Sequence, residues 1–193
     1  LLVVTVNHPE TSTVFLDRFL ASARAYRIPV TLLFNKVDLY NETEIQRLDE
    51  LIDLYKSVGY DCLVCDALHG KGIDEIRAQL KDKITLISGN SGVGKSTLIN
   101  NLLPNLNLKT SKISEKHNTG MHTTTFSEMF QLPDGGWIID SPGIKGFGMY
   151  DMNPEEIGHY FPEIFQHSEN CKYGNCTHTN EPQCAVKRAV ETG

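Results

Sequence analysis

The sequence predicts a three-layer α/β fold, in which helices cover both faces of a largely parallel sheet, followed by a small cysteine-rich segment. Short apolar runs alternate with stretches of helical periodicity along the first hundred residues. This alternation is typical of parallel strands joined by helical crossovers. Near the C-terminus core-forming residues become scarce and three cysteines cluster. We therefore divide the chain into an α/β domain, residues 1–166, and a C-terminal segment, residues 167–193.

The individual elements follow from the hydrophobic pattern. Short apolar runs predict strands at Leu1–Val6, Pro29–Phe34, Tyr60–Cys65 and Lys83–Ser88. Helical periods are expected at 11–26, 41–58 and 72–80, and a fourth helix ends near Leu103. In the first helix the predicted inward face is Phe15, Leu16, Phe19, Leu20 and Ala23. In the second it is Ile45, Leu48, Leu51, Ile52 and Tyr55.

The pattern changes after residue 103. Residues 104–125 are polar without a clear period, and a loop of that length is typical of a functional segment. Two apolar runs, 125–132 and 137–140, flank Pro-Asp-Gly-Gly and predict a hairpin. A second glycine-containing loop, 141–151, precedes a short helix expected at Pro154–Phe165.

Composition limits the classes of protein to consider. Hydrophobic residues make up 40% and charged residues 22%, so the chain can bury a core. The net charge of −6 argues against nonspecific nucleic-acid binding through bulk charge, although a local basic site is compatible with it. No apolar run is long enough to span a bilayer. Nothing suggests secretion, and we expect a cytoplasmic monomer that is part of a longer protein.

The strongest motif is Gly89-Asn90-Ser91-Gly92-Val93-Gly94-Lys95-Ser96, between a predicted strand and a predicted helix. It matches the phosphate-loop pattern of two glycines five residues apart followed by Lys-Ser. Glycines let successive backbone N–H groups point at phosphate oxygens, and the helix N-terminus adds partial positive charge. In this interpretation Lys95 reaches the β- and γ-phosphates, and the Ser96 hydroxyl ligates Mg²⁺.

The base is selected by another motif, Asn35-Lys36-Val37-Asp38, which follows a predicted strand. A carboxylate only accepts hydrogen bonds, and guanine presents adjacent N1–H and N2–H donors that Asp38 can bridge. Adenine offers an acceptor at N1 instead. Asn35 can hold the loop and contact the purine N7, while the Lys36 stem can lie across the base.

Two further loops complete the expected nucleotide site. Asp66-Ala67 stands where guanine-binding proteins present a Ser-Ala backbone N–H to guanine O6, although ordinary loop chemistry also explains the neighbouring glycines. Asp140-Ser141-Pro142-Gly143 closes a strand; Asp140 can orient a water on Mg²⁺ and the Gly143 N–H can meet the γ-phosphate. The expected GTP-binding residues are Asn35, Lys36, Asp38, Asp66, Ala67, Gly89, Asn90, Ser91, Gly92, Val93, Gly94, Lys95, Ser96, Thr97, Asp140 and Gly143.

Catalysis is expected to involve the end of the long polar loop, Gly120-Met121-His122-Thr123-Thr124-Thr125. Either Thr123 or Thr124 can ligate Mg²⁺ when the γ-phosphate is present, which would make the loop a switch. The residue after Asp140–Gly143 is Ile144, which cannot orient a water as the glutamine of Ras-like proteins does. His122 is the best substitute, because an imidazole can hold or deprotonate a water near neutral pH.

The order of the motifs is itself informative. Guanine recognition precedes the phosphate loop, whereas ordinary small GTPases have the reverse order. A circularly permuted P-loop GTPase domain has the order seen here, since chain termini usually lie at the surface and a cut there preserves the sheet.

The C-terminal cluster is Cys171-x₄-Cys176-x-His178-x₅-Cys184. Three thiolates and one imidazole suit a tetrahedral Zn²⁺ ion, which would organise a segment that lacks an apolar core. Cys62-x₂-Cys65 also has metal-like spacing. That pair lies in an apolar strand without a partner pair, which favours buried structural thiols.

These motifs together resemble the circularly permuted GTPases that depend on the small ribosomal subunit (RsgA/YjeQ), over essentially the whole chain. The resemblance depends on the order of the two nucleotide motifs, on Gly120–Thr125, on Asp140–Gly143 and on the zinc cluster. It departs at Met121, where the family often has a polar or basic residue.

The resemblance implies a GTP hydrolase that matures the small ribosomal subunit, including its rRNA, and is stimulated by that subunit. It also implies an N-terminal oligonucleotide-binding barrel and a longer zinc region, both outside this chain. The alternative class is a GTP-regulated binding module, such as a targeting or metal-handling switch, whose hydrolysis is incidental. The zinc cluster after Asp140–Gly143 favours the first class.

Overall fold

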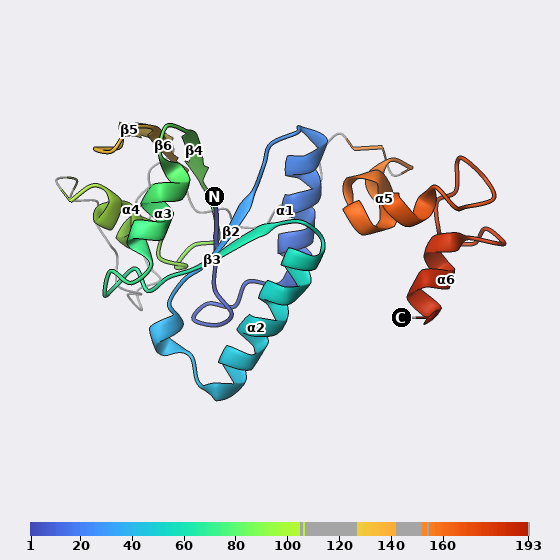
Figure 1. Ribbon diagram of the computed structural model, residues 1–193, viewed down its shortest axis with the longest axis horizontal. Coiled ribbons are helices and arrows are strands. Elements are labelled where there is room, and N and C mark those ends of the chain that lie inside the picture. The colour runs from blue at the N-terminus through green and yellow to red at the C-terminus, as the bar shows by residue number, and fades with distance from the viewer. Residues whose placement is uncertain (105, 107–126, 142–151, 154, 193) are drawn as a thin grey trace, which may run out of the picture. The chain divides into compact units, whose positions relative to one another are not determined.

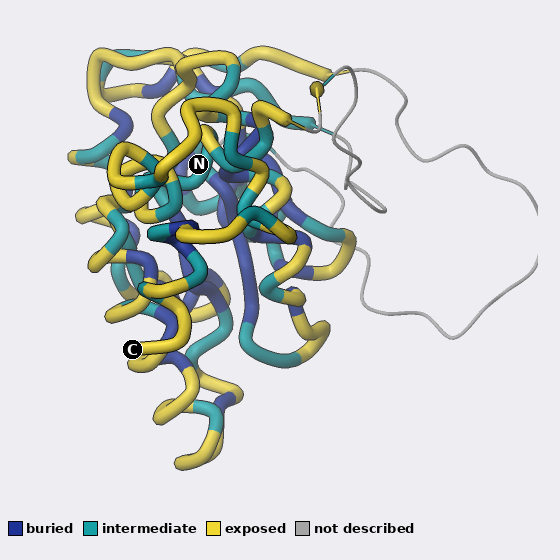
Figure 2. Tube along the Cα trace, turned by 90° about the vertical axis from the view of Figure 1, so that its right-hand side faces the viewer, coloured by how far each residue is buried: buried dark blue, intermediate teal, exposed yellow. Residues whose placement is uncertain are grey.

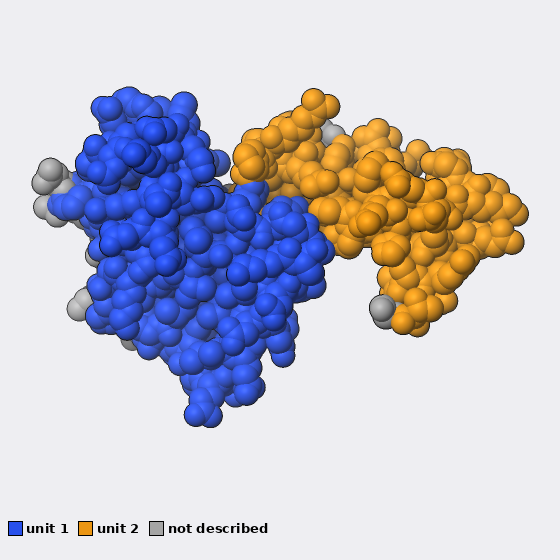
Figure 3. Space-filling view, in the orientation of Figure 1, with its two compact units in different colours: residues 1–12, 30–146 blue, residues 13–29, 147–193 orange. Residues whose placement is uncertain are grey.

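A computed structural model describes residues 1–104, 106, 127–141, 152–153 and 155–192 of the chain. The elements appear in Figure 1, and the two compact units into which the chain divides are coloured in Figure 3. Unit 1 comprises residues 1–12 and 30–146, and unit 2 comprises 13–29 and 147–193. The strands are β1 (Leu2–Val4), β2 (Thr31–Phe34), β3 (Asp61–Val64), β4 (Ile84–Ile87), β5 (Glu128–Gln131) and β6 (Trp137–Asp140). The helices are α1 (Thr13–Ala25), α2 (Glu42–Ser57), α3 (Ile73–Leu80), α4 (Lys95–Leu102), α5 (Pro162–Ser168) and α6 (Ala185–Thr192), with 3₁₀ turns η1 (Val37–Leu39) and η2 (Ile157–Tyr160).

The strands of unit 1 form two three-stranded sheets, ordered β1-β2-β3 and β4-β6-β5, with β1 next to β4. The first three pair in parallel, β4 pairs in parallel with β6, and β5 pairs antiparallel with β6. A parallel bridge between Leu2 and Ser88 joins β1 to the end of β4, and the Val3 N–H donates to the Ser88 carbonyl at 2.8 Å. The predicted parallel sheet and the predicted hairpin are both confirmed.

Helices lie on both sides of these strands. Successive side chains of a strand point to opposite faces, so a strand that is apolar throughout needs a covering layer on each face. Val3 and Leu33 are fully buried in one core cluster with Ile76 of α3 and Leu98 of α4. In Figure 1, α3 and α4 lie on one side of the strands of unit 1 and α2 lies on the other. The strands β1 and β2 are buried on both faces, as the dark blue tube in Figure 2 shows. Unit 1 therefore has the predicted three layers.

Helix α2 begins at a capping box. The Asn41 side chain accepts a hydrogen bond from the Glu44 N–H, and the Glu44 carboxylate accepts one from the Asn41 N–H. Leu48, Leu51 and Tyr55 are buried as predicted, but Ile45 is 45% exposed. The prediction for Ile45 was wrong. This residue lies in the first turn of α2, and helical periodicity alone does not show whether a neighbouring element covers the apolar face at that end of the helix.

Unit 2 departs from the sequence prediction at Pro162, where a new helix begins. The helix expected at Pro154–Phe165 is instead the 3₁₀ turn η2 followed by α5, which starts at Pro162 and continues to Ser168. Proline has no N–H to donate within a continuing helix and is favoured in the first turn of a new one. Within this unit η2 packs against α1 and α5, and α5 packs against α6. The predicted boundary at residue 166 falls inside α5.

One part of the sheet is less covered than predicted. On β4, Ile84 is 68% exposed and Leu86 is 47% exposed, since alternate side chains of this strand point to a face that the described residues leave open. None of the helices in the described part of the chain has the length and apolar character needed to cross a lipid bilayer.

Candidate functional site

The phosphate-loop motif lies between β4 and α4, as predicted, and its lysine is held inside the loop. Lys95 opens α4, is 9% exposed, and donates from Nζ to the carbonyls of Gly89 and Asn90 at 2.8 Å each. Burial lowers the pKa of Lys95, and the charge of Asp140 opposes that shift. Among the described residues the ammonium group donates to neutral carbonyl oxygens alone, an arrangement that suits an incoming phosphate.

Two glycines of this loop have neighbours that leave no room for a side chain. A Cβ on Gly89 (φ +148°) would lie 2.2 Å from the Val3 carbonyl oxygen. A Cβ on Gly94 (φ +99°) would lie 2.3 Å from Asn35 Nδ2. The first close approach fixes the loop against β1, and the second fixes it against the Asn35–Asp38 motif.

Asn35 connects three loops through one side chain. It is 1% exposed, and its Nδ2 donates to the Val93 carbonyl at 2.8 Å. Its Oδ1 accepts from the Ala67 N–H at 3.0 Å and from the Cys65 thiol at 3.1 Å. The phosphate loop, the Asn35–Asp38 motif and the Asp66–Ala67 loop therefore meet at this amide. The Ala67 N–H, expected to face guanine O6, is directed to Asn35 in this structure.

The Asn35–Asp38 motif turns sharply where β2 ends. Lys36 has a left-handed backbone (φ 66°), and its Nζ donates to the His8 carbonyl at 2.6 Å. Burial lowers the pKa of Lys36, while Asp38 raises it. Asp38 lies in η1, directly after this turn.

Tyr40 fixes the backbone at the start of the Asn35–Asp38 motif through its hydroxyl. The sequence analysis missed this residue. Its hydroxyl donates to the Asn35 carbonyl at 2.7 Å and accepts from the Val6 N–H at 2.8 Å. Burial is the main cause that raises the pKa of Tyr40 to about 12. An aromatic residue two positions after the motif is the signal that could have indicated this role.

Asp66 is fully buried and paired with His69, a second residue that the sequence analysis missed. Its Oδ1 accepts from the His69 N–H at 3.0 Å, and its Oδ2 lies 2.7 Å from His69 Nδ1. Burial would raise the pKa of Asp66, but the hydrogen bonds from the His69 backbone and ring outweigh it, and the net shift is downward. The same Nδ1 lies 3.9 Å from an Asp38 carboxylate oxygen.

Asp140 ends β6 near the phosphate loop. The adjoining Ser141 hydroxyl donates to the Ile87 carbonyl at 2.9 Å, which fixes the end of β6 to the end of β4. Burial raises the pKa of Asp140, Lys95 opposes the shift, and Glu128, its cross-strand neighbour on β5, adds to it. Ser96 and Thr97 follow Lys95 in α4. His122, Thr123, Thr124 and Gly143 lie outside the described residues.

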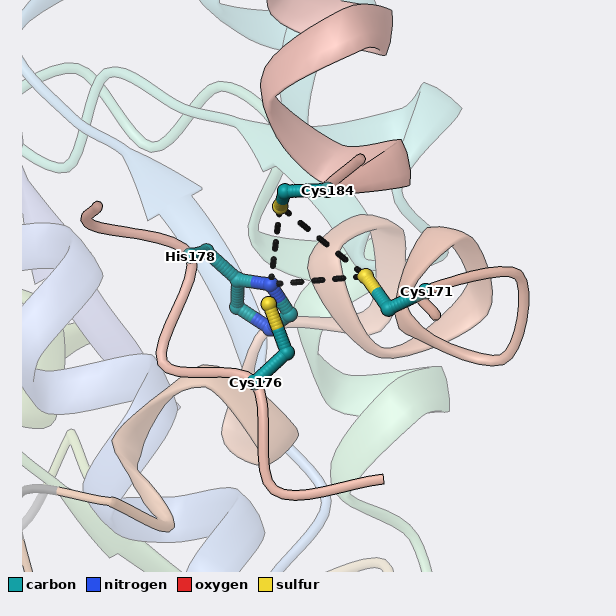
Figure 4. Close-up of side chains that lie close together, drawn as sticks. All are labelled: Cys171, Cys176, His178 and Cys184. Carbon is teal, nitrogen blue, oxygen red and sulfur yellow. Dashed lines mark hydrogen bonds between the residues drawn. The ribbon is translucent and has the colours of Figure 1, made fainter. Parts of the chain in front are cut away.

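The four predicted zinc ligands come together between α5 and α6 (Figure 4). Cys171 Sγ is 3.9 Å from Cys184 Sγ and 3.7 Å from His178 Nδ1, and Cys184 Sγ is 3.4 Å from His178 Nδ1. Ideal tetrahedral coordination of zinc gives S···S and S···N separations of about 3.8 and 3.6 Å. Cys176 completes the group, whose ligand atoms all lie within 4.8 Å of one another.

The turn that carries His178 is organised by a carboxylate. Glu181 accepts from the Thr177 N–H at 2.9 Å and from the Thr179 and Asn180 N–H groups at 3.1 Å each. It also accepts from the Thr177 hydroxyl at 2.6 Å. These bonds hold the pKa of Glu181 near 2 and fix the left-handed backbone of His178 (φ 62°). Glu181 thus positions a candidate metal ligand without belonging to the cluster.

Cys62 and Cys65 are separate from this cluster. Burial raises the pKa of the Cys62 thiol to about 11 and that of Cys65 to about 12. Among the described residues, neither thiol belongs to a group of side chains that could hold a metal ion. Cys65 is buried and donates to Asn35, which agrees with the predicted structural role.

Comparisons with known proteins agree with this geometry. The family model described as RsgA GTPase matches residues 1–150. The chain is 67% identical over 191 residues to the small ribosomal subunit biogenesis GTPase RsgA of Bacteroides fragilis, covering 99% of this chain and 62% of that protein. It is 53% identical over 195 residues to the protein of the same name from Porphyromonas gingivalis, again covering 62% of it. The chain therefore spans less than two thirds of these relatives.

Two solved structures share the fold. The crystal structure of YjeQ from Thermotoga maritima matches with a TM-score of 0.84 at 38% identity, over 100% of this chain and 63% of that one. YloQ, described as a circularly permuted GTPase, matches with a TM-score of 0.78 at 30% identity, over 100% of this chain and 61% of that one.

The Asn35 amide gives a testable prediction. Asn35→Ala leaves the Val93 carbonyl and the Ala67 N–H without their buried partner. We expect the free energy of unfolding to fall by about 2–4 kcal/mol, the range for two orphaned buried groups. Urea denaturation followed by circular dichroism measures it. The exposed Asn170→Ala is the control and should change stability by about 0.5 kcal/mol or less. Equal midpoints for the two variants contradict the proposed link.

Proposed function

The chain belongs to the RsgA GTPase family, and we propose that it binds GTP and hydrolyses it to GDP and phosphate. We further propose that the full-length protein matures the small ribosomal subunit and that this subunit, including its rRNA, stimulates hydrolysis. The names of the relatives support the ribosomal role. A cytoplasmic, monomeric protein is part of the same proposal.

One observation carries the proposal of GTP binding. The Asn35 side chain joins the base-recognition motif to the phosphate loop, with 2.8 Å between its Nδ2 and the Val93 carbonyl oxygen. A guanine nucleotide spans those two loops, with its base at Asp38 and its phosphates at residues 89–96. Apart from the Ala67 N–H, which donates to Asn35, the site residues named from the sequence keep their proposed roles, including Asp140 toward a Mg²⁺-bound water and Gly143 toward the γ-phosphate.

Two metal ions belong to the proposal. Mg²⁺ would bind with GTP through Ser96 and through Thr123 or Thr124, and it would neutralise phosphate charge. One structural Zn²⁺ would bind Cys171, Cys176, His178 and Cys184. The distances among these donors and their soft, thiolate-rich chemistry support zinc.

Base choice tests the proposed function. GTP and GDP should bind, and ATP should bind at least about 100-fold more weakly, because Asp38 would face an acceptor on adenine. Asp38→Asn should shift the preference toward xanthine nucleotides, whose base carries the complementary carbonyl. Fluorescence titration measures the affinities, and equal binding of ATP and GTP by the wild-type protein contradicts the assignment.

Elemental analysis of the purified protein tests the zinc proposal. We expect one zinc per chain, and its loss on the double substitution Cys171→Ser with Cys176→Ser. The matched control, Cys62→Ser, should retain the metal, since Cys62 lies on β3 outside the cluster. GTP affinity should change little in any of these variants. A double-substituted protein that still contains one zinc per chain would contradict the proposal.

A further prediction concerns His122, which lies outside the described residues. Ile144 cannot position the attacking water, so intrinsic hydrolysis should be slow, and we propose that His122 supplies this function when the small ribosomal subunit is bound. His122→Ala in the full-length protein should remove most of the stimulated rate while GTP affinity and the intrinsic rate change little. Turnover measured with and without small subunits is the assay. Undiminished stimulation would show that another residue or rRNA holds the water.

A further inference from the structure

The loop after β3 pairs the buried carboxylate of Asp66 with His69, a histidine to which the proposed GTP site gives no role. Asp66 is 0% exposed, and its Oδ2 lies 2.7 Å from Nδ1 of His69. The same nitrogen is 3.9 Å from Oδ2 of Asp38, the carboxylate assigned to guanine. The His69 side chain is 58% exposed, so the ring lies at the surface with one nitrogen near both carboxylates.

These three residues could in principle hold a cation, because their donor atoms lie within 4.8 Å of one another. The geometry favours a hydrogen bond instead. Two ligands of one tetrahedral zinc ion are about 3.3 Å apart when both are N or O donors. The 2.7 Å between Asp66 and His69 is shorter and is an ordinary length for a charge-assisted N–H···O bond.

The pair is fixed in place by the backbone around it. Asp66 and Lys71 exchange two backbone hydrogen bonds of 3.1 and 3.0 Å, which close the loop on itself. The next residue, Ala67, donates from its N–H to Asn35 and accepts from Asn101 Nδ2 at 2.7 Å. His69 is therefore presented from a closed loop anchored at both ends.

The location of Asp66 creates an electrostatic problem at the base site. Its carboxylate is a second negative charge in the same cluster as Asp38, and like charges at this range repel one another. An imidazole N–H carries positive potential in the neutral ring and a full charge when the ring is protonated. Placed beside both carboxylates, it offsets the repulsion and attracts Asp38 from one side.

We propose that His69 is a positioning residue for guanine specificity: anchored by Asp66, it holds the Asp38 carboxylate in the orientation that bridges the two base donors. This inference rests on the proposed assignment of Asp38 to guanine. It predicts that removing the ring weakens guanine nucleotides selectively, without affecting phosphate chemistry once the site is saturated.

The test compares bases and variants in the full-length protein by fluorescence titration. His69→Ala should weaken GDP about five- to tenfold, the effect of one partly exposed charged contact. IDP, which lacks the 2-amino group, should weaken by about twofold or less, because one of the two Asp38 contacts is already absent. His69→Asn, whose amide nitrogen can occupy the position of Nδ1, should restore most of the GDP affinity. The matched control is His167→Ala, an exposed histidine on α5.

A background without the carboxylate separates positioning from loop integrity. In Asp38→Asn protein, His69→Ala should change XDP affinity by less than about twofold, because the group that His69 positions has been removed. Equal weakening of GDP, IDP and XDP would show that His69 only maintains the loop, and would overturn the inference. So would an unchanged GDP affinity in a His69→Ala protein whose wild type prefers GDP over ADP. A wild type without that preference would overturn the proposed function itself.

Discussion

The nucleotide site depends on the side-chain amide of Asn35. This one buried group donates to the phosphate loop and accepts from the loop after β3, and its own backbone starts the base-recognition motif. A primary amide suits the position because it offers donors and an acceptor on one planar group. Alanine would satisfy neither partner, and an ionised aspartate would present an acceptor to the Val93 carbonyl oxygen. A single short side chain therefore holds the phosphate loop, the Asn35–Asp38 motif and the loop after β3 together.

The sheet explains how this contact forms although its partners are 58 residues apart. β1 lies between β2 and β4, so the carboxyl ends of these parallel strands meet at one edge. The loops that follow them are neighbours in space whichever comes first in the sequence. Circular permutation therefore leaves such a site intact, because the site depends on strand neighbours and strand direction.

The two units are stabilised in different ways. Unit 1 has a contiguous apolar core that places α3 and α4 against the sheet. The described C-terminal part of unit 2 has few buried apolar side chains. Three thiols and one imidazole converge there, beside a turn that the Glu181 carboxylate organises. A bound metal ion supplies in such a segment the stabilisation that a core supplies elsewhere.

The sequence by itself determined the α/β class, the hairpin, the phosphate loop, the Asn35–Asp38 motif and the four candidate metal ligands. Those features depend on local spacing, and local spacing is visible in a sequence. Only the tertiary structure decided that the Tyr40 hydroxyl bonds the backbone of Asn35, that one nitrogen of His69 lies near two carboxylates, and that the side chain of Ile45 is exposed. Each of these depends on which remote segment lies opposite, and that is set by strand order and by the covering of each helix face. Periodicity shows the direction of a side chain relative to its own element but not the neighbour that it meets.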